Sequence, residues 1–133
     1  MSDSIELLRR TYSAFNASRD VEDVLYAFHP AFRTTVPGEL SVEPDTYDGH
    51  EGLRRYMASF YEVMDEVDFE LVGIEELGEW VIAHSLMHTR ARHTGIRSDQ
   101  EVWLAWRFED GLALEARPFA DRGAALGALA QPE

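Results

Sequence analysis

The sequence predicts an α+β domain in which three N-terminal helices cover one face of a strongly curved antiparallel or mixed sheet. Two observations carry this prediction. Apolar residues recur at helical spacing over roughly the first half of the chain, and from residue 67 they alternate with polar residues at a period of two. Three turn signals, Gly78-Glu79, Thr94-Gly95 and Asp110-Gly111, divide the second half into strands. A length of 133 residues suits one domain over residues 1–133.

The helices are expected in three segments. The first spans residues 3–18 and starts with DSIE, a capping-box-like sequence. The second spans residues 20–29, and it ends there because the residue before Pro30 avoids helical backbone angles. The third begins at Asp48 and carries an apolar stripe.

The remaining segments are expected to be strands and loops. Residues 32–36 are predicted as a short strand, and residues 37–47 as a loop because they hold two prolines and a glycine. Four longer strands are predicted near residues 67–77, 80–93, 96–109 and 112–120. A short helix over about residues 121–130 ends the order.

The length of the two middle strands predicts a pocket. Each has about fourteen residues, which corresponds to roughly 46 Å. A sheet of that length twists and bends, so one of its faces is hollow. Helices that cover the hollow face incompletely leave a cone that is open at one end, where a small ligand can bind.

The hairpin at Thr94-Gly95 indicates which face is hollow. A two-residue turn there places His88 opposite Glu101 and Leu86 opposite Trp103 on a charged face. The other face is nearly free of charge and is predicted to be the hollow one. The charged face, with Leu86, His88, Glu101 and Trp103, exposes a Trp–Leu pair, which predicts a homodimer packed through this outer face.

Side chains on the uncharged face and on the facing helices are the predicted ligand contacts. These are Tyr12, Phe15, Tyr56, Phe60, Met87, Thr89, Gln100, Leu104 and Trp106. A buried tyrosine hydroxyl needs a hydrogen-bond partner, which is either a ligand oxygen or the backbone. The sequence leaves both alternatives open for Tyr12 and Tyr56.

Tyr12, Glu115 and Arg117 are the candidate catalytic residues. A two-residue turn at Asp110-Gly111 places Glu115 and Arg117 inside, where they would act as general base and anion stabiliser. A three-residue turn with a bulge places them outside. The outside placement is favoured, because a Glu and an Arg paired on an exposed face are ordinary.

Composition excludes several kinds of chemistry. The chain has no cysteine and no lysine, which excludes disulfides, thiolate ligands and Schiff bases. His84 and His88 stand roughly 13 Å apart on a strand and cannot share a metal, so neither metal nor organic cofactor is expected. The net charge of −13 disfavours nucleic acid and anionic membranes as partners. The N-terminus lacks a signal-peptide pattern, and a cytoplasmic location is expected.

Three segments resemble a known family. LLRRTYSAFNASRD, YDGHEGLRRYMASF and WRFEDGLALEARPFADRGAALGAL occur in the order found in SnoaL-like proteins of the nuclear transport factor 2-like superfamily. The resemblance implies a cone-shaped, cystatin-like α+β barrel that is often dimeric. Relatives include ketosteroid isomerases, polyketide cyclases and scytalone dehydratase, so the fold does not decide the function.

The chain departs from the isomerase pattern at its acids. The general base of ketosteroid isomerase falls near Thr35, its protonated acid at Leu104, and its tyrosine donor at Thr11 beside Tyr12. The leading hypothesis is therefore a protein that binds a small, largely apolar organic molecule, with isomerase, cyclase or hydrolase activity left open. The alternative is a non-catalytic ligand-binding or dimeric interaction domain.

Overall fold

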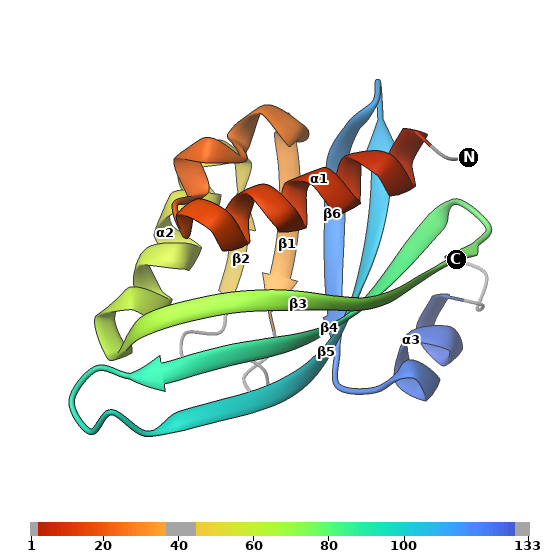
Figure 1. Cartoon of the computed structure of the whole chain (residues 1–133). Helices are drawn as coiled ribbons and strands as arrows, with labels where there is room; N and C mark the ends of the chain where they lie inside the picture. The colour runs from red at the N-terminus through yellow and green to blue at the C-terminus, as the bar shows by residue number, and fades with distance from the viewer. Residues whose placement is uncertain (1–2, 37–44, 130–133) are drawn as a thin grey trace.

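The computed structural model describes residues 3–36 and 45–129, and it confirms the α+β class. Six strands form one open sheet in the order β2-β1-β6-β5-β4-β3 (Figure 1). The pair β1–β6 is parallel and the other neighbours are antiparallel. The strands are β1 (Phe28–Val36), β2 (Asp45–Asp48), β3 (Met64–Leu77), β4 (Trp80–Ala91), β5 (Arg97–Glu109) and β6 (Leu112–Phe119).

Helices cover both faces of this sheet, but unequally. The helices α1 (Asp3–Ser18) and α2 (Gly49–Val63) pack on the inner face, where the main core lies. The short α3 (Arg122–Leu129) packs on the opposite face against Ile82 and Ala105. In the described part of the chain, no helix has both the length and the apolar character needed to cross a bilayer.

The predicted second helix is wrong. Residues 20–29 form two short 3-10 turns, Val21–Asp23 and Leu25–Ala27, and β1 has already begun at Phe28. The Asp20 carboxylate accepts the backbone N–H of Glu22 (3.0 Å), which fixes a tight turn instead of a long helix. Pairing of β1 with β6 then outweighs the weak helical pattern.

Proline also falls inside β1, at a place where the sheet tolerates it. The pairing of β1 with β6 is interrupted between Phe28 and Arg33, and β2 pairs only from Arg33 onwards. Pro30 lies in this interruption, so its missing N–H removes no ladder hydrogen bond. In the predicted loop 37–47, residues 45–47 belong to β2, and residues 37–44 lie outside the described residues.

The β4–β5 register differs from the prediction by two residues. His88 faces Asp99 instead of Glu101, and Trp103 faces His84 instead of Leu86. The connection is longer than two residues because the N–H of Ala91 donates to the carbonyl of Ile96 (2.9 Å). A shift of two residues leaves every side chain on the same face. The predicted assignment of inner and outer faces therefore stands.

Asn16 fastens α1 to the free edge of the sheet. Its Nδ2 donates to the carbonyl of Phe69 (2.7 Å), and its Oδ1 accepts the N–H of the same residue (2.9 Å). Because β3 is an edge strand, Asn16 satisfies backbone groups that no neighbouring strand reaches. This pair of bonds helps to fix the helix that carries Tyr12 and Phe15.

We expect Asn16→Asp to lower the free energy of unfolding by about 1–3 kcal/mol, because aspartate loses the donated bond and faces the Phe69 carbonyl with a negative charge. Urea unfolding of both proteins measures the difference. Ser13→Asp, an equal charge added to an exposed position of the same helix, is the matched control. Equal losses in the two variants would contradict this role for Asn16.

Candidate functional site

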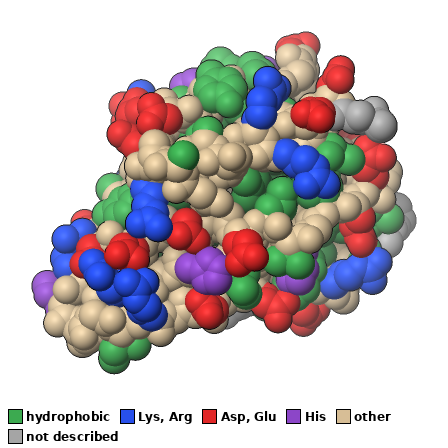
Figure 2. Space-filling model, viewed as in Figure 1, with side chains coloured by type: hydrophobic (Ala, Val, Ile, Leu, Met, Phe, Trp, Pro, Cys, Tyr) green, Lys and Arg blue, Asp and Glu red, His purple; other side chains and the backbone are tan. Residues whose placement is uncertain are grey.

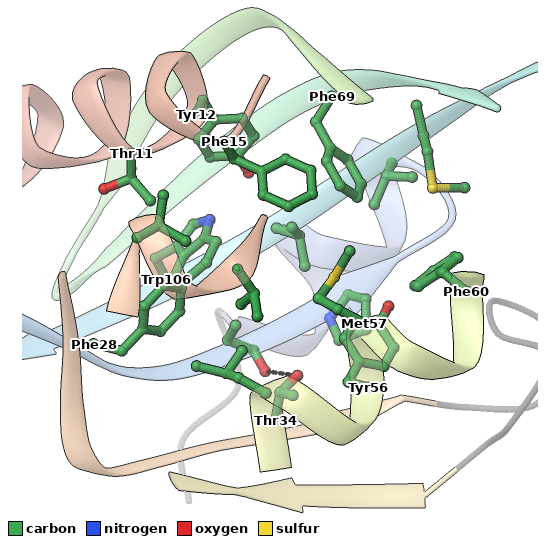
Figure 3. Close-up of a pocket in the computed structure, with 18 of the residues that line it drawn as sticks. Thr11, Tyr12, Phe15, Phe28, Thr34, Tyr56, Met57, Phe60, Phe69 and Trp106 are labelled. Carbon is green, nitrogen blue, oxygen red and sulfur yellow. Dashed lines mark hydrogen bonds between the residues drawn. The ribbon is translucent and has the colours of Figure 1, made fainter. Parts of the chain in front are cut away.

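A cavity of about 140 Å³ lies between α1, α2 and the inner face of the sheet (Figure 3). Its wall is made mostly of apolar and aromatic side chains. The residues are Thr11, Tyr12, Phe15, Asn16, Val21, Val24, Phe28, Phe32, Thr34, Leu53, Tyr56, Met57, Phe60, Phe69, Met87, Val102, Leu104, Trp106, Ala116 and Pro118. None of these described wall residues is an Asp, Glu, His or Arg, so the wall holds no group that titrates near neutral pH.

All but two of the predicted ligand contacts stand in this wall; the exceptions are Thr89 and Gln100. Thr89 is buried and its hydroxyl lies 3.5 Å from the carbonyl oxygen of Ser98. Gln100 is exposed, together with the rest of residues 97–101 of β5. Gln100 lies opposite Met87, and residues 97–99 continue from there towards the tip of the β4–β5 hairpin.

Sequence reasoning missed the part of the wall that β1 and the 3-10 turns contribute. Four wall residues belong to the segment that is predicted from the sequence as a helix and a short strand: Val21, Val24, Phe28 and Phe32. Their apolar character was the available signal. Without the correct local structure, that signal could not place them beside Trp106, whose ring centroid lies 5.9 Å from that of Phe28.

Three polar side chains of the wall form hydrogen bonds with backbone groups. The Thr11 hydroxyl donates to the carbonyl of Leu7 (2.6 Å), one turn earlier in α1. The Thr34 hydroxyl donates to the carbonyl of Ala116 (2.8 Å), which is the bond drawn in Figure 3. Asn16 is held by the backbone of Phe69. These three side chains therefore already have hydrogen-bond partners within the chain.

Tyr12 and Trp106 differ from those three. The Tyr12 hydroxyl and the Trp106 Nε1 are buried without a hydrogen-bond partner of acceptable geometry. Their rings stand edge to face, with centroids 6.4 Å apart. The buried Ser85 hydroxyl is also unpartnered, but Ser85 is not part of the wall. For Tyr12, the structure thus lacks the backbone bond that was one of the two predicted alternatives.

Burial keeps both wall tyrosines protonated. It raises the pKa of Tyr12 well above the ordinary 10.0, and the nearby indole N–H of Trp106 offsets only part of that rise. Burial also raises the pKa of Tyr56, whose ring packs between Tyr47 and Phe60. Both phenols therefore remain neutral hydrogen-bond donors at physiological pH.

Glu115 and Arg117 lie on the outer face, as favoured from the sequence. A register shift between Arg107 and Phe108 decides this, and it places Glu115 opposite Arg107 and Arg117 opposite Ala105. The Glu115 carboxylate accepts two bonds from Arg107 (2.7 and 3.1 Å). The Arg117 guanidinium lies over the ring of Trp80, 5.8 Å from its centroid. Neither residue can act on a molecule inside the cavity in this arrangement.

The outer face carries ion pairs and stacked rings. Figure 2 shows acidic, basic and histidine side chains interleaved over β3, β4 and β5. His84 stacks on Trp103 (centroids 4.1 Å apart, planes at 5°) and bonds to Glu101 (2.8 Å). Leu86 and Trp103 are half-buried, not exposed as predicted, partly because α3 and its neighbours pack beside Trp103. The homodimer through this face stays a prediction.

A group of possible metal ligands was not expected from the sequence. Ligand atoms of His29, Glu109 and Asp110 lie within 4.8 Å of one another. However, His29 Nδ1 accepts the N–H of Ala31 (2.9 Å), so the proton of the neutral ring is on Nε2, which faces Asp110 (3.8 Å). A metal would need that nitrogen unprotonated. The geometry favours a turn-stabilising contact over a metal site.

His88 generates a pH prediction. Hydrogen bonds to Asp99 (2.7 Å) and Glu70 (2.9 Å) raise its pKa above the ordinary 6.5. A raised pKa in the folded state gives stability that is fully present below pH 6.5 and is lost as pH rises through the raised value. We expect the melting-temperature difference between wild type and His88→Gln to be larger at pH 6 than at pH 9.

Differential scanning calorimetry at both pH values measures that difference. His93→Gln, which removes an exposed imidazole from the β4–β5 connection, is the control and should show no such change with pH. A His88→Gln effect that grows towards pH 9 would be the wrong sign for this contact.

Comparison with known proteins agrees with this fold. The SnoaL-like domain family matches residues 8–116, and no curated protein matches the chain. An NTF2-like protein of unknown function from Burkholderia pseudomallei K96243 is 24% identical, with 96% of this chain and 97% of that chain covered and a TM-score of 0.79.

Two further solved structures are similar. TerC, co-crystallised with polyporic acid, is 22% identical, with 98% of this chain and 100% of that chain covered and a TM-score of 0.78. A candidate SnoaL-like polyketide cyclase from Jannaschia sp. CCS1 is 18% identical, with 99% and 94% covered and a TM-score of 0.73. Since the family match covers far more than half of the chain, the protein belongs to the SnoaL-like domain family.

Proposed function

We propose that this protein binds one small, neutral and largely apolar organic molecule in the cavity. The observation that carries the proposal is the wall itself, whose described residues include no acid, histidine or arginine. A charged ligand would lose its hydration there and gain no opposite charge. An apolar ligand gains the burial of its surface against aromatic and aliphatic side chains.

The volume limits the size of the enclosed part. A dry engineered cavity of about 150 Å³ in another protein takes up benzene. The present cavity, at about 140 Å³, is of the same order, so we infer that it encloses a moiety of about one six-membered ring. A larger molecule would extend beyond the cavity. The presence of polyporic acid in the TerC crystal supports an organic molecule as the ligand of this fold.

A cofactor-independent isomerase, cyclase or hydrolase is the second candidate. It is favoured by Tyr12, whose protonated hydroxyl could stabilise a developing oxyanion, and by the cyclase among the structural neighbours. The described wall residues supply no carboxylate or imidazole to act as its general base, and Glu115 is held by Arg107 on the outer face. We therefore favour ligand binding without acid–base catalysis over this second candidate.

Methyl NMR tests the binding proposal directly. Met57 and Met87 line the cavity, whereas Met64 packs against the core outside the wall. With methionine methyl groups labelled, we expect toluene to shift the signals of Met57 and Met87 in a saturable manner and to leave Met64 nearly unchanged. Equal shifts at all three, or none, would contradict the proposal.

Filling the cavity provides the matched variant. Ala116 lies in the wall and is 3% exposed. We expect Ala116→Leu to weaken the affinity for toluene, measured from the methyl shifts, by at least about tenfold. Val72→Leu adds a methylene at a position that is 56% exposed and serves as control. Should Ala116→Leu fail to fold, Val102→Leu fills the same space from β5. Unaltered binding in a folded filled variant would sink the proposal.

A further inference from the structure

We propose that the ligand carries an uncharged carbonyl oxygen, and that this oxygen binds to the Tyr12 hydroxyl and the Trp106 indole N–H. This inference rests on the proposed function, since it assigns the polar part of the same cavity. Tyr12 comes from α1 and Trp106 from β5, so the two donors approach from opposite walls (Figure 3).

The two side chains offer more donors than acceptors. The indole N–H can only donate, and the protonated phenol has one proton to donate. If the phenol oxygen accepts the indole proton, its own proton still has no acceptor. Neither atom has a hydrogen-bond partner among the described residues. An acceptor supplied from outside the chain would satisfy both.

Phe28 and Phe32 pack against the Trp106 ring, with centroids 5.9 and 6.4 Å away. The hydroxyls of Thr11 and Thr34 already donate to backbone carbonyls. In the described wall, the Tyr12 hydroxyl and the Trp106 Nε1 are the fully buried polar side-chain atoms that have no hydrogen-bond partner. A ligand oxygen that accepts from them removes the cost of burying unpaired donors.

A carboxylate or phenolate would need a cation, and the described wall has none. The raised pKa of Tyr12 keeps its proton in place, so the phenol donates to the ligand without ionising. A neutral carbonyl oxygen has two lone pairs and can accept from both donors at once. This makes a ketone, aldehyde, ester or amide the expected class.

A ligand can reach the pair only after a small side-chain movement. Both atoms have almost no accessible surface in this conformation. A ligand oxygen consequently reaches them only when the Tyr12 or Trp106 side chain shifts slightly, so we expect binding to change the NMR signal of the indole N–H.

The pair also differs from the positions Thr11 and Leu104, onto which the tyrosine and acid donors of ketosteroid isomerase map.

The test compares two probes of the same shape, cyclohexanone and methylenecyclohexane. The ketone loses more hydration on binding than the hydrocarbon does. The informative quantity is therefore the ratio of the two dissociation constants, each measured by methionine methyl NMR. We expect Tyr12→Phe to change that ratio about tenfold against the ketone and to leave the hydrocarbon affinity within about twofold. Tyr26→Phe, which removes a phenol hydroxyl from a side chain that is 56% exposed and outside the wall, should leave the ratio unchanged.

Indole NMR gives the second readout. Among the three tryptophans, only Trp106 lines the cavity. Trp80 and Trp103 pack on the opposite face of the sheet, in the cluster around Ile82 and Ala105. We expect cyclohexanone to move the Trp106 N–H signal downfield and methylenecyclohexane not to. A ratio unaffected by Tyr12→Phe, with hydrocarbon binding intact, overturns this inference alone. If neither probe binds, the proposed function falls as well.

Discussion

Alternation of side chains along β4, β5 and β6 is the constraint on which the rest of the molecule depends. Each charged side chain of these three strands, from His84 and Glu101 to Glu115, points to the outer face. The opposite positions carry apolar or small polar residues and form the inner face. One geometric rule therefore produces both an ionic outer face and a cavity whose described wall residues carry no charge.

The consequences for chemistry follow from this separation. Outer carboxylates are engaged with arginine or histidine: Glu115 with Arg107, Asp99 with His88, and Glu101 with His84. These half-exposed pairs add little stability each, and the described residues of the cavity wall include no charged side chain. The described inner wall therefore combines shape and apolar surface with the buried donors of Tyr12 and Trp106.

The extent to which the sequence predicts this arrangement depends on which property is asked for. Strand parity survives an error in register, so the faces were predicted correctly although the β4–β5 pairing was shifted by two residues. The helices 3–18 and 49–63 follow from their periodicity. Residues 20–29 were predicted wrongly because their state depends on the pairing of β1 with β6, a contact distant in the sequence.

The position of Glu115 depended on a feature that no local pattern encodes. One extra residue in β6, Leu114, lies between the partners of Arg107 and Phe108 and turns Glu115 outwards, whereas a regular ladder would have placed Glu115 in the cavity beside Leu104 and Trp106. A single bulge therefore separates a wall without a base from one with a buried carboxylate. In this fold, a change of one residue in a hairpin would alter the chemistry of the cavity more than many substitutions in its wall.

The unpartnered donors Tyr12 and Trp106 have an energetic cost for the unliganded protein. Burying the Tyr12 hydroxyl and the Trp106 N–H without acceptors opposes folding, and phenylalanine at either position would avoid the penalty while retaining an aromatic ring. A fold that needed only a packed interior would gain stability from that exchange. The penalty is relieved when an acceptor enters from outside, so the groups that weaken the unliganded protein are those that would select its ligand.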